Sequence, residues 1–209
     1  MKEILWHADC ADSKCKYMHQ TFIQSGCYFM VTHHARGISL KSYLEAKKYL
    51  PENQIEFIAF QLVKGIGQLH DNNIIFNNVT TESILITDQG DVQLVNYQSS
   101  CILQNQMLKV IPPNLCQGHL ETCSPEMLDA NTSYDFVSDW WSLGVLLYRL
   151  LCSYPPYKGA TKEILLSKIK EKEVVFPDKK KYAIEYSDEL VSLIKALLTK
   201  DRPYRLGNN

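Results

Sequence analysis

The sequence predicts an α+β domain that is mostly helical and carries two small β-hairpins. Two observations support this prediction. Apolar residues recur at helical spacing through most of the chain, and two short β-branched or aromatic segments each flank a turn signal. The 209 residues, 45% hydrophobic and 22% charged, are enough for one good-sized domain or two small ones with a hydrophobic core.

The first hairpin is expected near the N-terminus. The aromatic and β-branched segment at residues 27–34 follows a similar segment at residues 17–24. Ser25 and Gly26 supply the turn between them, because both residue types favour tight turns. Gly37 is then expected to end the strand region.

Two helices are expected after this hairpin. A short helix begins near Leu40 and stops before Pro51, because proline interrupts helical hydrogen bonding. A stronger helix over residues 52–70 ends at Asn72 and Asn73. One apolar stripe is expected along it, formed by Ile55, Ile58, Ala59, Leu62, Val63, Ile66 and Leu69.

The second hairpin is expected from strands at residues 84–86 and 92–95. The Asp- and Gly-containing segment between them, residues 87–91, is a typical turn. Residues 98–122 have no clear periodicity, which favours a functional loop within so compact a chain.

The C-terminal half is expected to be helical. A short helix follows Ser124-Pro125-Glu126, and residues 139–151 are so apolar that a helix buried on all sides is expected. Two amphipathic helices are expected near residues 160–171 and 187–199.

Composition excludes several classes of function. A net charge of −1 gives no electrostatic basis for binding nucleic acid, so no nucleic-acid partner is expected. The longest apolar run is about a dozen residues, so no transmembrane segment is expected. Seven cysteines without a C-x-x-C motif favour buried free thiols over disulfides or zinc. The N-terminus is not typical of a secretory signal, so the expected location is cytoplasmic.

Five segments, in order along the chain, resemble the motifs of the protein kinase superfamily. They are LHDNNIIFNNVTTESILI (the catalytic loop), DVQLVNYQ (the strand leading to D-F-G), CSPEML (the A-P-E motif), YDFVSDWWSLGVLLYRLLCSYPPYKG (the buried helix) and DRPYRLG. The double tryptophan and the RLG ending resemble the AGC group of serine/threonine kinases, near its ribosomal-protein-kinase branch.

This resemblance implies a protein kinase-like fold, mainly the helical large lobe with the last small-lobe strands. The chain is then a single domain over residues 1–209, with residues 1–35 as a remnant of the small lobe and hinge and 36–209 as the large lobe. A glycine-rich phosphate loop and a Val-Ala-x-Lys motif are not found in the sequence, so the nucleotide clamp of a kinase is not expected in this chain.

The resemblance also identifies replaced catalytic positions. Asn78 stands where a kinase has its catalytic aspartate, and an amide cannot serve as a general base. Thr80 replaces the catalytic-loop lysine, and Ser83 and Asn96 replace the two metal-binding positions, without the negative charge that Mg²⁺ prefers in its ligands. His119 replaces a threonine that contacts the catalytic aspartate and lysine.

Other positions match the family scaffold. Val31, His33 and Leu85 are the adenine-pocket positions by resemblance. Asp139 is expected to hold the catalytic-loop backbone through hydrogen bonds. The remaining scaffold positions are Glu126 and Arg205, which match a buried ion pair, and Phe76 and Tyr97, which match stacked apolar positions beneath the site.

These replacements favour a pseudokinase, a kinase-fold binding or scaffold module whose partners are other proteins, including an active kinase whose conformation it biases. No cofactor is expected on this hypothesis. The alternative is a serine/threonine protein kinase that binds ATP and Mg²⁺ and has weak or atypical phosphotransfer. A third hypothesis is a truncated kinase fragment, since the resemblance starts at the hinge strands and ends soon after Arg205.

Overall fold

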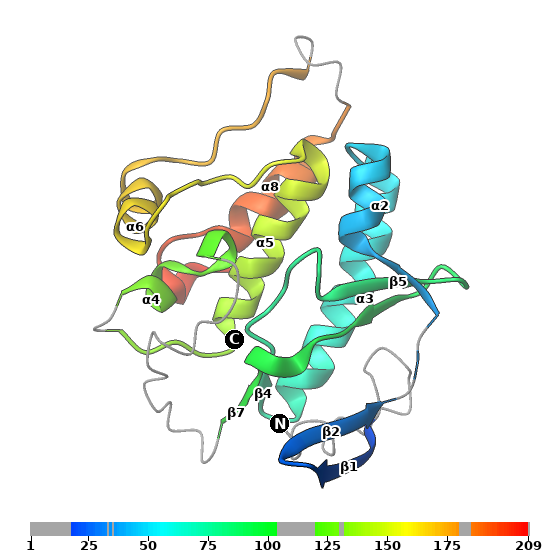
Figure 1. The fold of residues 1–209 in the computed structure, drawn as a ribbon. Helices are drawn as coiled ribbons and strands as arrows, with labels where there is room; N and C mark the ends of the chain where they lie inside the picture. The colour runs from blue at the N-terminus through cyan, green and yellow to red at the C-terminus, as the bar shows by residue number, and fades with distance from the viewer. Residues whose placement is uncertain are drawn as a thin grey trace.

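The computed structural model describes residues 18–32, 34, 36–103, 120–129, 132–179 and 185–208. Figure 1 shows α5 (Val137–Cys152) in the middle of a helical body. The helices α2 (Leu40–Lys47) and α3 (Glu52–Asp71) form one side of this body. On the other side lie α4 (Pro125–Leu128) and α6 (Lys162–Glu171) (Figure 1). The predicted α+β, kinase-like architecture is confirmed.

The core is built around α5, which packs against α3 and against α8 (Asp188–Leu197). Leu143, Leu147 and Leu150 of α5 are each at most 1% exposed, as expected for a helix enclosed by neighbours. Gly144 permits the close approach of α8, because a Cβ atom there would lie 2.9 Å from Leu197 Cβ. The predicted buried helix is confirmed.

The buried face of α3 follows the predicted stripe with one exception. Ile55, Leu62, Ile66 and Leu69 are at most 1% exposed, but Val63 is 46% exposed. The prediction for Val63 was wrong, because it lies at the edge of the stripe and turns away from α5 and β6, against which the helix packs.

A three-stranded antiparallel sheet lies against α3. The predicted hairpin is formed by β5 (Ile84–Thr87) and β6 (Val92–Leu94), and β3 (Gly37–Ser39) pairs with the other edge of β5. The expectation that Gly37 ends the strand region was therefore wrong. A Cβ atom added at Gly37 would overlap the Ile86 carbonyl oxygen, so only glycine lets the two strands approach here.

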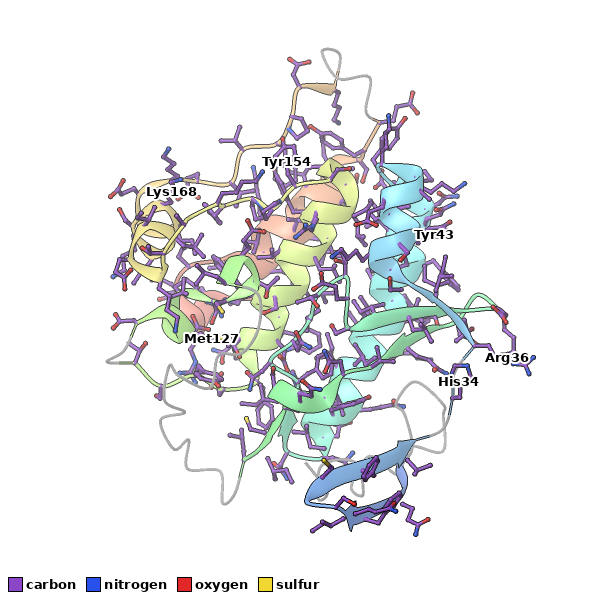
Figure 2. The ribbon with its side chains drawn as sticks, in the orientation of Figure 1. His34, Arg36, Tyr43, Met127, Tyr154 and Lys168 are labelled. Carbon is purple, nitrogen blue, oxygen red and sulfur yellow. The ribbon has the colours of Figure 1, made fainter. Side chains whose placement is uncertain are left out.

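The N-terminal hairpin is formed by β1 (Met18–Gln24) and β2 (Cys27–Thr32). Ser25 and Gly26 have φ of +51° and +75°, as a two-residue hairpin turn of the primed type requires. Figure 1 shows this hairpin projecting from the end of the body below β5, and Figure 2 shows His34 and Arg36 on the connection that follows it.

A second short strand pair closes the stretch that resembles the catalytic loop. β4 (Ile74–Ile75) pairs with β7 (Cys101–Ile102), and the Leu103 amide donates to the Asn73 carbonyl at 2.8 Å. The expected loop at residues 98–122 thus contains a strand, β7, close to its start, and residues 104–119 lie outside the described part. This pairing places the two ends of the segment from Ile74 to Ile102 side by side.

The remaining predicted helices are present with small shifts at their ends. The helices expected near residues 160–171 and 187–199 are α6 and α8. Short 3₁₀ turns occur at η1 (Tyr97–Ser99), η3 (Leu120–Thr122) and η4 (Arg202–Tyr204). Within the described ranges, no helix has both the length and the apolar character needed to cross a membrane.

Candidate functional site

Asp139 in the first turn of α5 holds the segment that resembles the catalytic loop. Its Oδ2 atom accepts from the Phe76 amide at 2.9 Å, and its Oδ1 atom accepts from the Asn77 amide at 2.8 Å. His70 Nε2 lies 2.8 Å from Oδ2, and the aspartate side chain is fully buried. A buried carboxylate is tolerated because these partners satisfy it.

Ser83 holds the segment that resembles the catalytic loop in a compact turn through hydrogen bonds to Asn78 and Thr80. Its hydroxyl donates to the Asn78 and Thr80 carbonyls and accepts from the Thr80 amide at 3.0 Å. The Thr80 hydroxyl lies 3.1 Å from Ser83 Oγ, and both side chains are buried. The two hydroxyls therefore act on the loop itself and hold it in a compact turn.

An amide connects the loop to the following hairpin. Asn78 Nδ2 donates to the Asn96 carbonyl at 3.2 Å, so the two asparagines meet across 18 residues of sequence. Asn96 has φ +63°, a left-handed conformation that asparagine adopts more readily than most residues. Its side chain is exposed.

These residues do not fit a magnesium site. Mg²⁺ prefers carboxylate oxygens, but Ser83 Oγ is fully buried and hydrogen-bonded within the loop, and Asn78 and Asn96 are neutral. Across the described ranges, no three His, Cys, Asp or Glu side chains gather in a group suited to a metal ion. Asn78, Thr80, Ser83 and Asn96 therefore provide hydrogen-bonding groups and no formal charge.

Val31 and Leu85, two of the predicted adenine-pocket positions, lie on different elements. Val31 is 43% exposed on β2 of the projecting hairpin, whereas Leu85 is half-buried in β5 (Figure 1). His33 and His119 lie outside the described residues. The polar contacts of the predicted site therefore lie within the loop and where it meets Asn96 after β6.

The aromatic pair beneath the loop is in contact. The Phe76 and Tyr97 rings meet edge to face with centroids 5.3 Å apart, and both residues are buried. Beside them, Asn77 Nδ2 donates to the Ser99 carbonyl and contacts Cys101 Sγ at 3.4 Å. Burial raises the pKa of the Cys101 thiol to about 11, so it is a neutral packing group.

Glu126 and Arg205 form a bidentate ion pair. Arg205 Nη2 donates to Glu126 Oε2 at 2.9 Å, and Nη1 donates to Oε1. The guanidinium also donates to the Thr199 carbonyl at 2.9 Å and lies 5.1 Å from the Trp141 ring. The pair thus fastens α4 and α5 to the segment after α8, with Arg205 only 2% exposed.

A polar hollow of about 240 Å³ beside the loop was not predicted. Lys41 and Glu82 pair across it at 2.7 Å, and Arg149 and Glu121 pair at 3.5 Å. Hydrogen bonding to Glu82 raises the pKa of Lys41. No signal in the sequence links Lys41 to Glu82, because 41 residues separate them and only the fold brings them together.

The sequence profile of the protein kinase domain matches residues 1–209. Among curated relatives, Protein kinase C-like 1 of Candida albicans is 28% identical over 191 residues, covering 91% of this chain and 16% of that protein. Serine/threonine-protein kinase sgk-1 of Caenorhabditis elegans is 30% identical, covering 91% of this chain and 39% of that protein.

A probable cAMP-dependent protein kinase catalytic subunit of Encephalitozoon cuniculi (strain GB-M1) is 28% identical, covering 91% of this chain and 55% of that protein. The chain therefore spans between about a sixth and about half of the length of these relatives. Their similarity over most of the chain confirms the resemblance to AGC-group kinases. The chain belongs to the protein kinase domain family.

Proposed function

We propose that this chain is a pseudokinase, a serine/threonine kinase-like module that binds and regulates other proteins in the cytoplasm without transferring phosphate. The observation that carries the proposal is the hydrogen bonding of the loop. Ser83 is bonded within the loop, and Asn78 donates its amide hydrogen to a carbonyl, so neither side chain presents a base or an anionic metal ligand.

The buried charged residues at the family's scaffold positions support a scaffold role. Asp139 and the Glu126–Arg205 pair hold backbone and helices, and each charged group is satisfied by hydrogen bonds. Partner proteins, among them an active kinase, are the expected ligands of such a module. No cofactor is part of this proposal.

A second candidate is a serine/threonine kinase with weak or atypical phosphotransfer. The relatives favour it, because they are named as protein kinases and one of them as a probable catalytic subunit. ATP and Mg²⁺ would then be the cofactors, and Asn78, Thr80, Ser83 and Asn96 would occupy the reacting positions.

Thermal unfolding with ATP, in the presence and absence of Mg²⁺, separates the two candidates. We expect the melting temperature to change by less than about 1 °C, because a ligand stabilises a fold only when it binds the folded state. A Mg²⁺-dependent rise of several degrees contradicts the pseudokinase proposal.

Phosphate transfer is tested with radiolabelled ATP and a general protein substrate. We expect no incorporation above a buffer control. Incorporation that Asn96→Ala abolishes, and that the matched amide variant Asn53→Ala on an exposed turn of α3 leaves unchanged, establishes the kinase alternative.

A further inference from the structure

The outer face of α3 exposes a group of large apolar side chains. Phe57, Phe60 and Val63 are 54%, 61% and 46% exposed, although the opposite face of the same helix is fully buried. Single exposed apolar residues are common on proteins, but two phenylalanines and a valine on adjacent turns form a continuous patch. Such a patch on a surface helix is typical of an interaction site.

Two exposed charges of this face, Glu56 and Lys64, are arranged symmetrically about Phe60. Glu56 lies four residues before Phe60 and Lys64 four residues after it, so the two charges lie on opposite sides of the phenylalanine along the helix axis. Because each residue turns the helix by about 100°, the two charges also lie on opposite sides of Phe60 around the helix. Phe57 and Val63, three residues away in each direction, are related in the same way.

We propose that the outer face of α3 binds the same face of a second copy of this chain, with the two helices antiparallel and the two-fold axis passing beside Phe60. The Phe60 rings of the two copies then meet at the centre of the interface. Phe57 of each copy lies level with Val63 of the other, because a two-fold axis makes every contact reciprocal.

Charge complementarity selects a second copy as the occupant. Glu56 and Lys64 form no ion pair with any described residue, and the Lys64 ammonium lies over the Phe60 ring at 5.1 Å. Within one helix these two residues are about 12 Å apart along the axis and cannot pair. Antiparallel pairing places each Lys64 level with Glu56 of the other copy, so the surface is complementary to itself.

The far end of the face leaves room for the second helix. A Cβ atom added at Gly67 would have no neighbour within 4 Å, so the surface is open there. In the antiparallel arrangement Asn53 of the other copy lies level with Gly67, and the absent side chain allows the two backbones to approach at this point.

The size of the interface predicts a weak, reversible dimer. The overlap covers residues 52–68 of each copy, about five helical turns, which places the buried area at the low end for specific protein interfaces. We therefore expect a dissociation constant in the range of about 1 to 100 μM. Sedimentation equilibrium of the whole 209-residue chain across this concentration range measures it.

Charge reversal on this face provides the decisive test. Glu56→Lys places a second positive charge beside Lys64 of the other copy, and Lys64→Glu places a second negative charge beside Glu56. We expect each single variant to raise the dissociation constant at least about tenfold, because like charges then face each other at both symmetric contacts. Phe60→Ser is expected to weaken the dimer as well, by removing the central aromatic contact.

Mixing the two charge-reversal variants is expected to restore the dimer. The Glu56→Lys copy carries a positive charge at both positions, and the Lys64→Glu copy carries a negative charge at both, so each contact between them joins opposite charges. The control is Glu45→Lys, a charge reversal on the exposed face of α2, which is expected to leave the dissociation constant of the dimer unchanged. Circular dichroism spectra confirm that each variant is folded.

Three results overturn the proposal. They are a wild-type chain that stays monomeric over the whole concentration range, a dimer that neither charge reversal weakens, and a pair of single variants that does not associate when mixed. In each case the face of α3 is not covered by a second copy in the antiparallel arrangement.

Discussion

The segment that resembles the catalytic loop (residues 74–83) and the groups around helix α5 differ in the charge of their buried polar side chains. Around α5, three charged groups are buried and paired: Asp139 with two backbone amides, and Glu126 with Arg205. In the loop, Asn78, Thr80 and Ser83 are also buried, but all are neutral and bond within the loop or to the hairpin that follows it.

This difference shows which requirement each region meets. A buried charge costs several kcal/mol unless it is paired, so the charges around α5 are retained only with their partners. Neutral amides and hydroxyls can hold a backbone turn with a smaller desolvation penalty, but they supply neither a general base nor a negatively charged metal ligand. The buried charges thus position the loop from outside it, whereas Asn78, Thr80 and Ser83 hold the loop with neutral groups.

The largest expected loss of stability follows from breaking the Glu126–Arg205 ion pair. Glu126→Ala leaves a buried guanidinium without its carboxylate, and we expect the free energy of unfolding to fall by about 3–5 kcal/mol. Equilibrium unfolding in urea measures this change. The matched control is Glu173→Ala, which removes an exposed partner of Lys200 and should cost less than about 1 kcal/mol. Equal effects at both sites contradict the structural role of the buried pair.

The next largest effect is expected at Asp139. Asp139→Asn keeps the shape but turns an NH₂ group toward one of the two backbone amides, so we expect a loss of about 2–3 kcal/mol. Hydrogen exchange at the Phe76 and Asn77 amides should become faster, because these amides donate to the aspartate. Unchanged protection of both amides shows that the loop is held by other contacts.

A smaller loss of stability is expected at alkaline pH, where Cys101 ionises in the unfolded chain. Burial raises the pKa of Cys101 to about 11 in the folded chain, above the value of about 9 in the unfolded chain. The resulting stability is complete below pH 9 and is lost as the pH rises toward 11, because only the unfolded chain ionises there.

The loss assigned to Cys101 is up to about 2 kcal/mol. Melting curves of the wild type and Cys101→Ala at pH 8 and pH 10.5 measure it as the difference between the two chains. Parallel losses in both chains contradict this assignment, since Cys152 and Tyr157, whose pKa values are also raised by burial, are common to both.

The smallest effects are expected where acids are placed at the two asparagines. Asn78→Asp loses the bond to the Asn96 carbonyl and sets a carboxylate against that oxygen, at a cost of about 1 kcal/mol. Asn96→Asp changes an exposed side chain and is expected to stay within about 0.5 kcal/mol. Urea unfolding of both variants provides the comparison, and a larger loss at Asn96 than at Asn78 contradicts this order.

Local patterns in the sequence predict the elements whose contacts are close in sequence. Helix α3 follows from its apolar stripe, and the β5–β6 hairpin follows from a turn between two short strands. β3 was missed because its partner lies far along the chain, Ser39 pairing with Leu85. β7 was missed because two residues are too few to show a period, although they pair with β4.

The candidate site likewise has features that the sequence predicts and features that only packing decides. The positions of Asn78 and Asn96 follow from motif order, but their hydrogen bond depends on how the hairpin folds back. The closed arrangement of Ser83 and Thr80 depends on backbone geometry, and the Lys41–Glu82 pair depends on α2 packing beside the loop. The adenine positions Val31, His33 and Leu85 remain predictions.

The sequence by itself determined the family, the order of the elements and the identity of the neutral residues at the loop. These properties are local or depend on motif order, so they can be read along the chain. Only the tertiary structure decided which polar groups meet, which strands pair across long separations and which apolar side chains of α3 remain exposed. Hydrogen bonds and burial depend on distances between segments, and those distances are fixed only when the chain packs.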